Sequence, residues 1–303
     1  MSFRDLWATA EDGLRLYARE YGRPHGAALP VLCLPGLTRN SSDFHDLALL
    51  LAEGGRRVVA VDYRGRGRSG HDPDPARYEL KVELSDVLQV AAVAGLDEAV
   101  VVGTSRGGLL AMALSAARPA LLRGVVLNDI GPVIEPAGLA AIKGYVGRLG
   151  TPRDHAEAAE MLRQRFGAQF PALGAPQWRA WAERTWTGEA GGLVLSYDPA
   201  LMKNLEAFDP AAPVPPFWGL FAGLTAVPVL ALRGEHSDLL SAGTLQAMAA
   251  AHPGLEAVTV PGQGHAPLLE GEVAERVAGF VARVEAAQDA ARRTEQPTAQ
   301  PTT

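Results

Sequence analysis

The pentapeptide Gly-Thr-Ser-Arg-Gly at residues 103–107 constrains the fold of this chain more than any other stretch. A short apolar, β-branched run over 99–102 precedes it, and a helical pattern of apolar residues follows at once. Strand, tight turn and helix in this order are the context in which a Gly-x-Ser-x-Gly turn exposes a reactive hydroxyl. Gly103 and Gly107 are small enough to let backbone segments pass closely there. The context therefore predicts that Ser105 is a nucleophile.

Predicted strands and helices alternate from residue 30 onward, after an N-terminal β-hairpin over 3–8 and 14–21. Such alternation favours a mostly parallel sheet covered by helices on both faces, an α/β fold. The strands are expected at residues 31–34, 57–61, 99–102, 124–127, 227–232 and 255–260. Besides the helix after the pentapeptide, helices are expected at 43–53, 79–93 and 244–251, and a final helix has one apolar face over 273–284.

The alternation stops at residue 131, and three helices are expected before the sheet resumes. The first covers 138–149 and the third covers 176–187. The second has Thr151 as its N-cap and ends at Gly167. A proline-rich exit then leads back to the strand at 227–232. A helical insertion inside an α/β core accounts for this pattern.

The domain organisation expected from these patterns is a core in two pieces with a cap between them. The core comprises residues 1–131 and 217–286, and the helical cap comprises 132–216. Residues 287–303, rich in Gln, Thr, Pro and Ala, are expected to form a disordered tail.

Composition limits the classes of partner. The net charge of −6 gives no reason to expect nucleic-acid binding. No apolar stretch reaches membrane-spanning length, and the N-terminus lacks an apolar signal region, so a cytoplasmic location without membrane contact is expected. The single cysteine, Cys33, lies in an apolar run and excludes an intramolecular disulfide. We expect a small molecule as the partner, and the sequence leaves the oligomeric state open, a homodimer included.

A dinucleotide fingerprint is present but lies in the wrong context. Gly65, Gly67 and Gly70 follow a predicted strand with the spacing of that motif. In dinucleotide sites the third glycine opens a helix whose N-terminus holds the pyrophosphate. Here prolines and aspartates follow over 71–75, which break a helix and repel phosphate. We therefore expect no nicotinamide or flavin cofactor, and the histidines lack the spacing of metal ligands, so no metal is expected either.

Two further chemical groups follow the late strands. Asp238 lies in the loop after the strand at 227–232, and His265 lies in a glycine-rich loop after the strand at 255–260. Loops that follow parallel strands lie at the carboxyl ends of those strands, on the same side of the sheet as Ser105. Acyl transfer needs a hydroxyl, a base of pKa near 7 and an acid that fixes the tautomer of the base. The chain order Ser, Asp, His is the one expected of an α/β-hydrolase.

With these motifs the chain resembles a capped member of the α/β-hydrolase superfamily over essentially its whole length except the tail. The resemblance implies Ser105 as nucleophile, His265 as general base and then acid, and Asp238 as the orienting carboxylate. Some relatives place the acid after the preceding strand, where this chain has Asp129, and that alternative stays open.

The resemblance also implies an oxyanion hole built from the backbone amides of Leu37 and Arg106. Many relatives carry His where this chain has Pro35, a departure that should leave the Leu37 amide usable.

Side chains outside the expected triad are open to two interpretations each. Trp178, Trp181 and Trp186 are expected to pack the cap, with some of them also binding substrate. The arginines at positions 64, 66 and 68 are interpreted as structural or solvated, with carboxylate binding as the alternative.

The nucleophile narrows the chemistry. Relatives that open epoxides or displace halide use Asp at the position of Ser105, whereas a serine forms an acyl-enzyme. We expect a cofactor-independent serine hydrolase that cleaves a small, largely apolar carboxylic ester or lactone. The alternatives are a C–C bond hydrolase acting on a ring-cleavage product, an acyltransferase, and, from another class, a ligand receptor with slow turnover.

Overall fold

The computed structural model describes residues 2–24, 26–188, 192–206, 209 and 214–295. They contain a central sheet of eight strands in the order β1-β2-β4-β3-β5-β6-β9-β10. Strand β2 pairs antiparallel with β1 and β4, and the remaining pairs are parallel. The strands are β1 (Arg4–Thr9), β2 (Arg15–Tyr21), β3 (Val31–Leu34), β4 (Val58–Asp62), β5 (Ala99–Thr104), β6 (Leu122–Asn128), β9 (Val229–Gly234) and β10 (Leu255–Val260). The expected α/β-hydrolase fold class is therefore confirmed.

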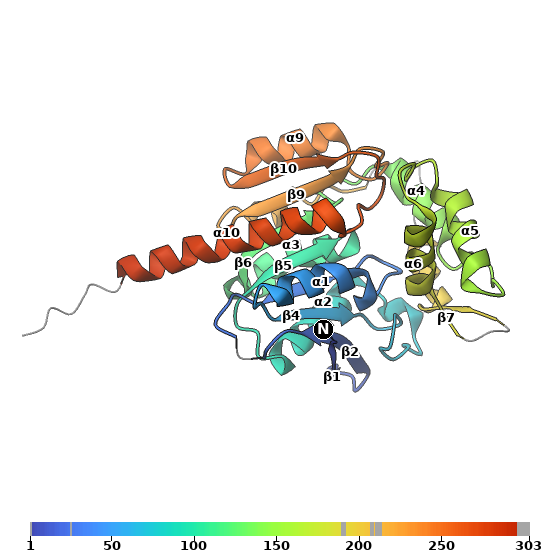
Figure 1. Ribbon diagram of the computed structural model, residues 1–303, viewed down its shortest axis with the longest axis horizontal. Helices are drawn as coiled ribbons and strands as arrows, with labels where there is room; N and C mark the ends of the chain where they lie inside the picture. Colours follow the sequence, from blue (N-terminus) through green and yellow to red (C-terminus); the bar gives the residue numbers. More distant parts are fainter. Residues whose placement is uncertain (1, 25, 189–191, 207–208, 210–213, 296–303) are drawn as a thin grey trace, which may run out of the picture.

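Helices cover both faces of this sheet (Figure 1). The helices of the core are α1 (His45–Glu53), α2 (Leu80–Val93), α3 (Arg106–Ala117), α8 (Trp218–Ala222), α9 (Ala242–Ala251) and α10 (Gly271–Glu295), with 3₁₀ turns η1 (Ser41–Phe44), η2 (Pro75–Arg77) and η3 (Pro119–Leu121). The sequence analysis did not predict α8.

The central strands are mostly apolar because both of their faces are buried. Successive residues of a strand point to opposite faces, so Val59 and Val61 of β4 pack in one cluster while Val58 and Ala60 pack in the other. The first cluster includes buried residues of α2, α3, α8 and α9, and the second those of α1 and α10.

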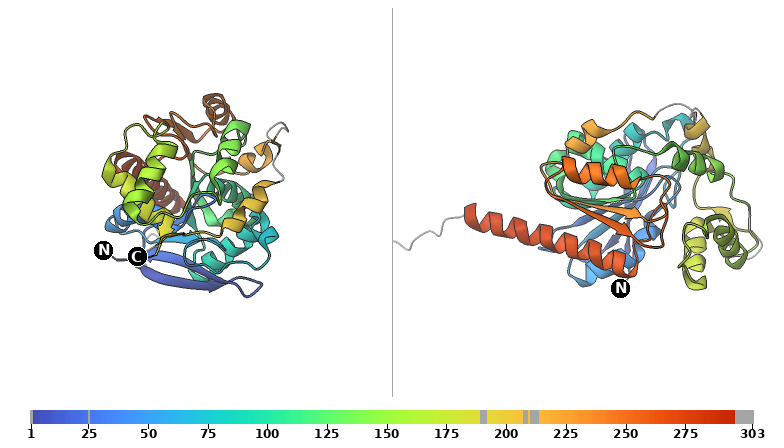
Figure 2. Two further views of the ribbon diagram at one scale, coloured as in Figure 1. Left: turned by 90° about the vertical axis from the view of Figure 1, so that its right-hand side faces the viewer. Right: turned by 90° about the horizontal axis from the view of Figure 1, so that it is seen from above.

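The elements between β6 and α8 form a separate group beyond one edge of the sheet (Figures 1 and 2). They are α4 (Pro136–Tyr145), α5 (His155–Phe166), α6 (Ala175–Thr185), the two-residue strands β7 (Trp186–Thr187) and β8 (Val194–Leu195), η4 (Pro199–Met202) and α7 (Lys203–Glu206). A small apolar cluster of its own, including Leu162, Phe170 and Trp178, holds α5 and α6 together. All of these elements fall within the segment predicted to be the cap.

Two local expectations differ from the structure. Asp154, not Thr151, caps α5, because its carboxylate accepts the amides of Ala156 and Glu157 at 2.9 Å each. Helix α10 continues to residue 295 into the segment predicted to be disordered, away from the cap (Figures 1 and 2). The alanines and arginines there favour helix, and Arg292 also pairs with Glu98 at 2.6 Å. Residues 296–303 of the predicted tail lie outside the described residues.

The glycine-rich loop after β4 forms no dinucleotide-binding turn. A Cβ on Gly67, whose φ is +56°, would lie 2.0 Å from the carboxylate of Asp62, so only glycine fits there. That carboxylate accepts the amides of Ser41 at 2.6 Å and Arg68 at 2.8 Å, which ties the loop to η1. No helix begins at Gly70, since η2 is the next helical turn in this part of the described chain.

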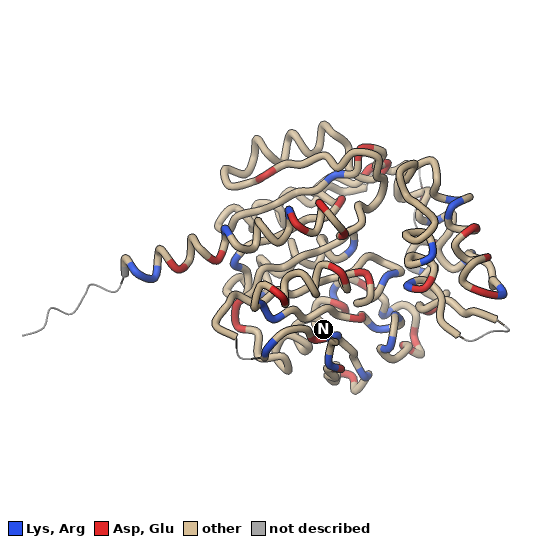
Figure 3. Tube along the Cα trace, viewed as in Figure 1, with Lys and Arg blue, Asp and Glu red and all other residues tan. Residues whose placement is uncertain are grey.

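Acidic and basic residues are interspersed along both the core and the cap (Figure 3). Among the described residues, no helix is both long and apolar enough to cross a membrane. Cys33 lies in β3 with no exposed surface, and its burial raises the pKa of the thiol well above the usual range. The expected role of Cys33 as a small buried apolar side chain agrees with this position.

Candidate active site

The turn between β5 and α3 holds Ser105 in a strained backbone conformation. Its φ is +51°, one of two positive values among non-glycine residues of the described chain. A Cβ on Gly103 would lie 2.4 Å from the carbonyl oxygen of Gly107, and one on Gly107 would lie 2.0 Å from that of Leu34. Both glycines are therefore required for the close approach, as the pentapeptide pattern predicted. The turn exposes the Ser105 hydroxyl at the carboxyl end of β5.

The imidazole of His265 reaches this hydroxyl from the loop after β10. Its Nε2 lies 2.9 Å from Oγ of Ser105, within hydrogen-bonding distance. The His265 side chain is only 10% exposed, so protein atoms surround most of the ring. The convergence of these two loops, expected from the strand order, is thus present in the structure.

The carboxylate on the other side of the imidazole belongs to Asp129, directly after β6. Its Oδ2 lies 2.7 Å from Nδ1 of His265. Asp129 has no exposed surface and a φ of +56°. The amide of Gly234 donates to Oδ1 at 2.7 Å, and the hydroxyl of Ser237 donates to Oδ2 at 2.6 Å. These hydrogen bonds hold the carboxylate against the ring.

The expectation that Asp238 orients His265 is corrected by this geometry. Asp238 lies beyond the end of β9, and its Oδ2 accepts a hydrogen bond of 2.9 Å from the side-chain amide of Gln169 in the cap. Its neighbour Ser237 contacts the acid that does meet the imidazole. The alternative left open by the sequence, an acid after the strand preceding the cap, is the arrangement found.

A hydroxyl, an imidazole and a buried carboxylate in this order can carry out nucleophilic catalysis. A carboxylate on Nδ1 favours the tautomer with its proton there, which leaves Nε2 free to accept the proton of the hydroxyl. It also stabilises the imidazolium that forms when the proton moves. The arrangement of Ser105, His265 and Asp129 is that of a catalytic triad.

Ser105 and His265 open onto a pocket of about 110 Å³ between the core and the cap. Core loops contribute one side of the pocket, including Gly36, Leu37 and Pro267. The cap contributes the other side, with apolar side chains from α4, α5 and α6 and the loops beside them: Ile142, Tyr145, Leu149, Leu162, Phe166 and Trp181. A small ligand in this pocket would lie next to the serine and be shielded from water by apolar groups.

One of the three tryptophans proposed to bind substrate lines this pocket. Trp181 lies on its wall and stacks on Trp178, with ring centroids 5.4 Å apart. Trp178 and Trp186 are buried in the apolar cluster of the cap and are absent from the pocket lining. The indole nitrogen of Trp186 donates to the carbonyl of Gly150 at 3.1 Å. The rings of these two residues pack the cap interior, and of the three tryptophans Trp181 is the one placed to contact a substrate.

The pocket also has a polar end that the sequence analysis missed. Arg39, from the loop after β3, donates to the Thr185 hydroxyl of the cap at 2.6 Å. Arg184 of the cap pairs with Glu270 of the core at 2.7 Å. All four side chains line the pocket, so these contacts tie the cap to the core at the pocket wall. Because the partners lie far apart in the chain, no sequence pattern could have paired them.

Of the residues predicted to supply the oxyanion hole, one shares the pocket of Ser105 and the other follows Ser105 in the chain. Leu37 lines the pocket, and Arg106 is the first residue of α3, where helical amides lack partners within the helix. Within the described part of the chain, neither amide donates a backbone hydrogen bond outside the regular elements. Both amides thus remain candidates for stabilising developing negative charge.

The described residues contain no cluster of three or more His, Cys, Asp or Glu side chains that could hold a metal ion.

Comparisons with known proteins define the class. Residues 31–280 match the model of the alpha/beta hydrolase family, so the chain belongs to that family. A solved structure of an alpha/beta hydrolase from Novosphingobium aromaticivorans superimposes with a TM-score of 0.87 at 41% identity. The match covers 94% of this chain and 99% of that one.

Two curated relatives are hydrolases as well. The chain is 33% identical over 263 residues to a 3-hydroxybutyrate-oligomer hydrolase of Cupriavidus necator. This alignment covers 84% of this chain and 87% of the relative. It is 29% identical over 243 residues to a 2-(acetamidomethylene)succinate hydrolase of Mesorhizobium japonicum, covering 80% and 84% respectively. These similarities support hydrolase activity, and they do not identify the bond that is cleaved.

The pocket geometry predicts different effects for two tryptophans. Replacing Trp181 by Ala removes a wall of the pocket, and we expect KM for a short ester to rise about tenfold, equivalent to ~1.4 kcal/mol of lost apolar contact. Trp186→Phe is the matched control, which should lower the melting temperature and leave KM unchanged. Steady-state kinetics and thermal melts of both variants check this, and an equal KM effect in the two would contradict the assignment of the pocket wall.

Proposed function

We propose that this protein is a cofactor-independent serine hydrolase that cleaves a small carboxylic ester. The observation that carries the proposal is the chain of contacts from Ser105 through His265 to Asp129 at the floor of a shielded pocket. A serine with a hydrogen-bonded base and an oriented acid is the arrangement that acyl transfer requires.

The proposed reaction has two halves. Nε2 of His265 takes the proton of Ser105 as Oγ attacks the ester carbonyl, and the amides of Leu37 and Arg106 donate to the oxyanion that forms. The imidazolium then protonates the leaving alkoxide, which departs as the alcohol and leaves an acyl-enzyme. In the second half, His265 removes a proton from water, the hydroxide oxygen attacks the acyl carbon, and Ser105 regains its proton on release of the acid.

The character of the pocket suggests which esters to test first. Its apolar cap wall suits a short aliphatic chain. Its polar end, where Arg39 contacts both Thr185 and Asp43, can accept a hydroxyl on the substrate. A relative of this chain is named for hydrolysing 3-hydroxybutyrate oligomers. Short esters of hydroxy acids combine both features and are the substrate class we propose.

A substrate panel tests the proposal against its alternatives. It contains p-nitrophenyl butyrate, the linear dimer of 3-hydroxybutyrate, a vinylogous 1,5-diketone acid, and p-nitrophenyl butyrate with an added alcohol acceptor. We expect sustained turnover of the two esters, release of free acid, and little cleavage of the diketone. Preferred cleavage of the diketone would favour a C–C hydrolase, transfer to the alcohol an acyltransferase, and binding with negligible turnover a receptor.

A further inference from the structure

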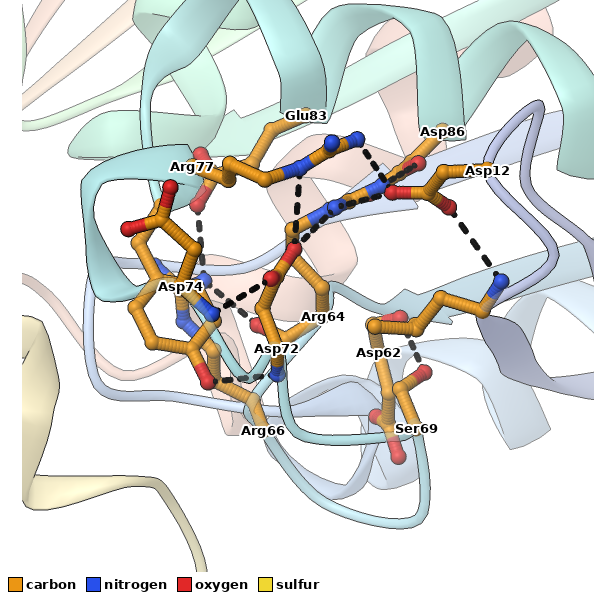
Figure 4. A network of polar contacts seen from close by, with 12 residues as sticks. Asp12, Asp62, Arg64, Arg66, Ser69, Asp72, Asp74, Arg77, Glu83 and Asp86 are labelled. Carbon is orange, nitrogen blue, oxygen red and sulfur yellow. Dashed lines mark hydrogen bonds and ion pairs between the residues drawn. The ribbon is translucent and has the colours of Figure 1, made fainter.

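A fully buried carboxylate on α2, Glu83, lies between two guanidinium groups beneath the active-site loops. Nη1 of Arg66 lies 2.7 Å from its Oε1 as an ion pair, and Nε of Arg106 donates to its Oε2 at 2.5 Å. The side chains of Glu83 and Arg66 have no exposed surface, and that of Arg106 is 15% exposed. Figure 4 shows Arg66 and Glu83 within the polar network around the loop that follows β4.

The cluster sets one buried carboxylate against two guanidinium groups. Burial by itself would raise the pKa of Glu83, but the charges of Arg106 and Arg66 outweigh it and hold that pKa below its usual value. Nη2 of Arg66 is buried and finds no hydrogen-bond partner among the described residues. Burying such a group costs free energy, and a buried ion cluster is weak evidence for a gain in stability. The cluster therefore contributes through the geometry that it imposes on the loops around it.

Each arm of the cluster ends at a residue proposed to supply an oxyanion-hole amide. Nε of Arg66 donates to the carbonyl oxygen of Leu37 at 2.8 Å, which restrains the loop after β3. The other arm is the side chain of Arg106 itself, whose Nη2 also donates to the carbonyl of Tyr78 at 3.1 Å. Glu83 thus links two backbone segments that lie far apart in the sequence.

We infer that Arg66 and Glu83 are positioning residues, which set the separation and direction of the Leu37 and Arg106 amides through this cluster. The inference rests on the proposed function, because it needs an oxyanion for those amides to meet. Oxyanion-hole donors act through preorganised geometry. A small displacement of these amides therefore reduces their stabilisation of the transition state more than it reduces substrate binding.

The same loop offers a matched control two residues away. Arg64 is also buried, with its side chain 1% exposed, and it pairs with Asp86 at 2.6 Å and with Asp72 at 2.5 Å. Among the described residues, its side chain makes no hydrogen bond or ion pair with either of the residues proposed to form the oxyanion hole. A variant of Arg64 therefore disturbs a similar buried ion cluster without loosening the proposed amides.

The experiment compares Arg66→Lys with Arg64→Lys in the full chain. Lysine at position 66 keeps the positive charge beside Glu83. Its single ammonium group cannot contact Glu83 and the Leu37 carbonyl in the way that two nitrogens of the Arg66 guanidinium do. For Arg66→Lys we expect kcat for p-nitrophenyl butyrate to fall about 10–100-fold with KM within about twofold of the parent. The affinity for a trifluoromethyl ketone, which forms a hemiketal oxyanion on Ser105, should fall by the same factor. Arg64→Lys should lower the melting temperature and leave both quantities near the parent values.

A second variant protects the test against a folding failure. Arg106→Met removes the more exposed arm, leaves Glu83 paired with Arg66, and should produce the same parallel loss of kcat and inhibitor affinity. Equal losses in the Arg64 and Arg66 variants, or a changed KM with unchanged inhibitor affinity, would overturn the inference while the proposed function stood. If the parent neither hydrolysed esters nor formed the hemiketal, the proposed function would fail and the inference with it.

Discussion

Ser105→Ala should abolish ester hydrolysis while leaving the fold intact. The substitution removes the atom that forms the acyl-enzyme, and loss of a triad member lowers kcat by about 10⁴–10⁶-fold. Alanine keeps the Cβ at a backbone position that already tolerates serine at a φ of +51°, so the melting temperature should stay close to that of the parent. The measurement is initial rates of p-nitrophenyl butyrate hydrolysis beside a thermal melt.

A neighbouring hydroxyl supplies the control for this prediction. Ser115 lies on α3, donates to the carbonyl of Met112 at 2.7 Å and is absent from the pocket lining. Ser115→Ala should retain parental kinetics. Hydrolysis by Ser105→Ala at the rate of the Ser115 variant would mean that another group performs the reaction.

Asp129→Asn should lower kcat by about 10³–10⁴-fold, whereas Asp238→Asn should change it by less than about tenfold. An amide at position 129 would donate toward Nδ1 of His265 instead of accepting from it, which favours the wrong tautomer of the imidazole. Asp238 contacts Gln169 in the cap, so its loss affects that contact and leaves the base in place. The measurement is kcat for the same ester in both isosteric variants.

Thermal melts accompany this pair because Asp129 also accepts the Gly234 amide and the Ser237 hydroxyl. A folded Asp129→Asn protein with parental kcat, together with a large loss in Asp238→Asn, would restore the assignment first made from the sequence.

The fold and two members of the triad could be predicted from sequence because their signals are local. A β-branched run, two glycines and a helical pattern specify the turn at Ser105, and His265 follows a clear strand in a glycine-rich loop. The boundaries of the sheet strands were also close, since buried parallel strands appear as continuous apolar runs.

The acid could not be chosen from the sequence, because two aspartates follow strands that end at the same edge of the sheet. Asp129 directly follows β6, the strand next to β5, whereas Asp238 lies in the loop beyond β9. The choice depends on a positive φ at residue 129 and on the donors of Gly234 and Ser237, which are long-range properties. The one local signal that favours Asp129 is its position directly after an apolar strand.

The cap shows the same limit. A tryptophan-rich helix predicts aromatic packing, but only the folded arrangement of α5 and α6 separates Trp181, on the pocket wall, from Trp178 in the interior. Likewise, the arginines after β4 were interpreted as structural or solvated. Arg64 and Arg66 are buried in ion clusters, and Arg68, half-exposed, pairs with Asp5 at 2.7 Å.

Mapping the adduct of a fluorophosphonate most directly tests the claim that Ser105, His265 and Asp129 act as one unit. The reagent phosphonylates a serine that an adjacent base has activated, and peptide mass spectrometry locates the product. We predict a single adduct at Ser105 in the parent and in Asp238→Asn, with a rate that falls sharply in His265→Ala and Asp129→Asn. An adduct on another serine, or equal labelling rates in all four proteins, would contradict the proposed mechanism.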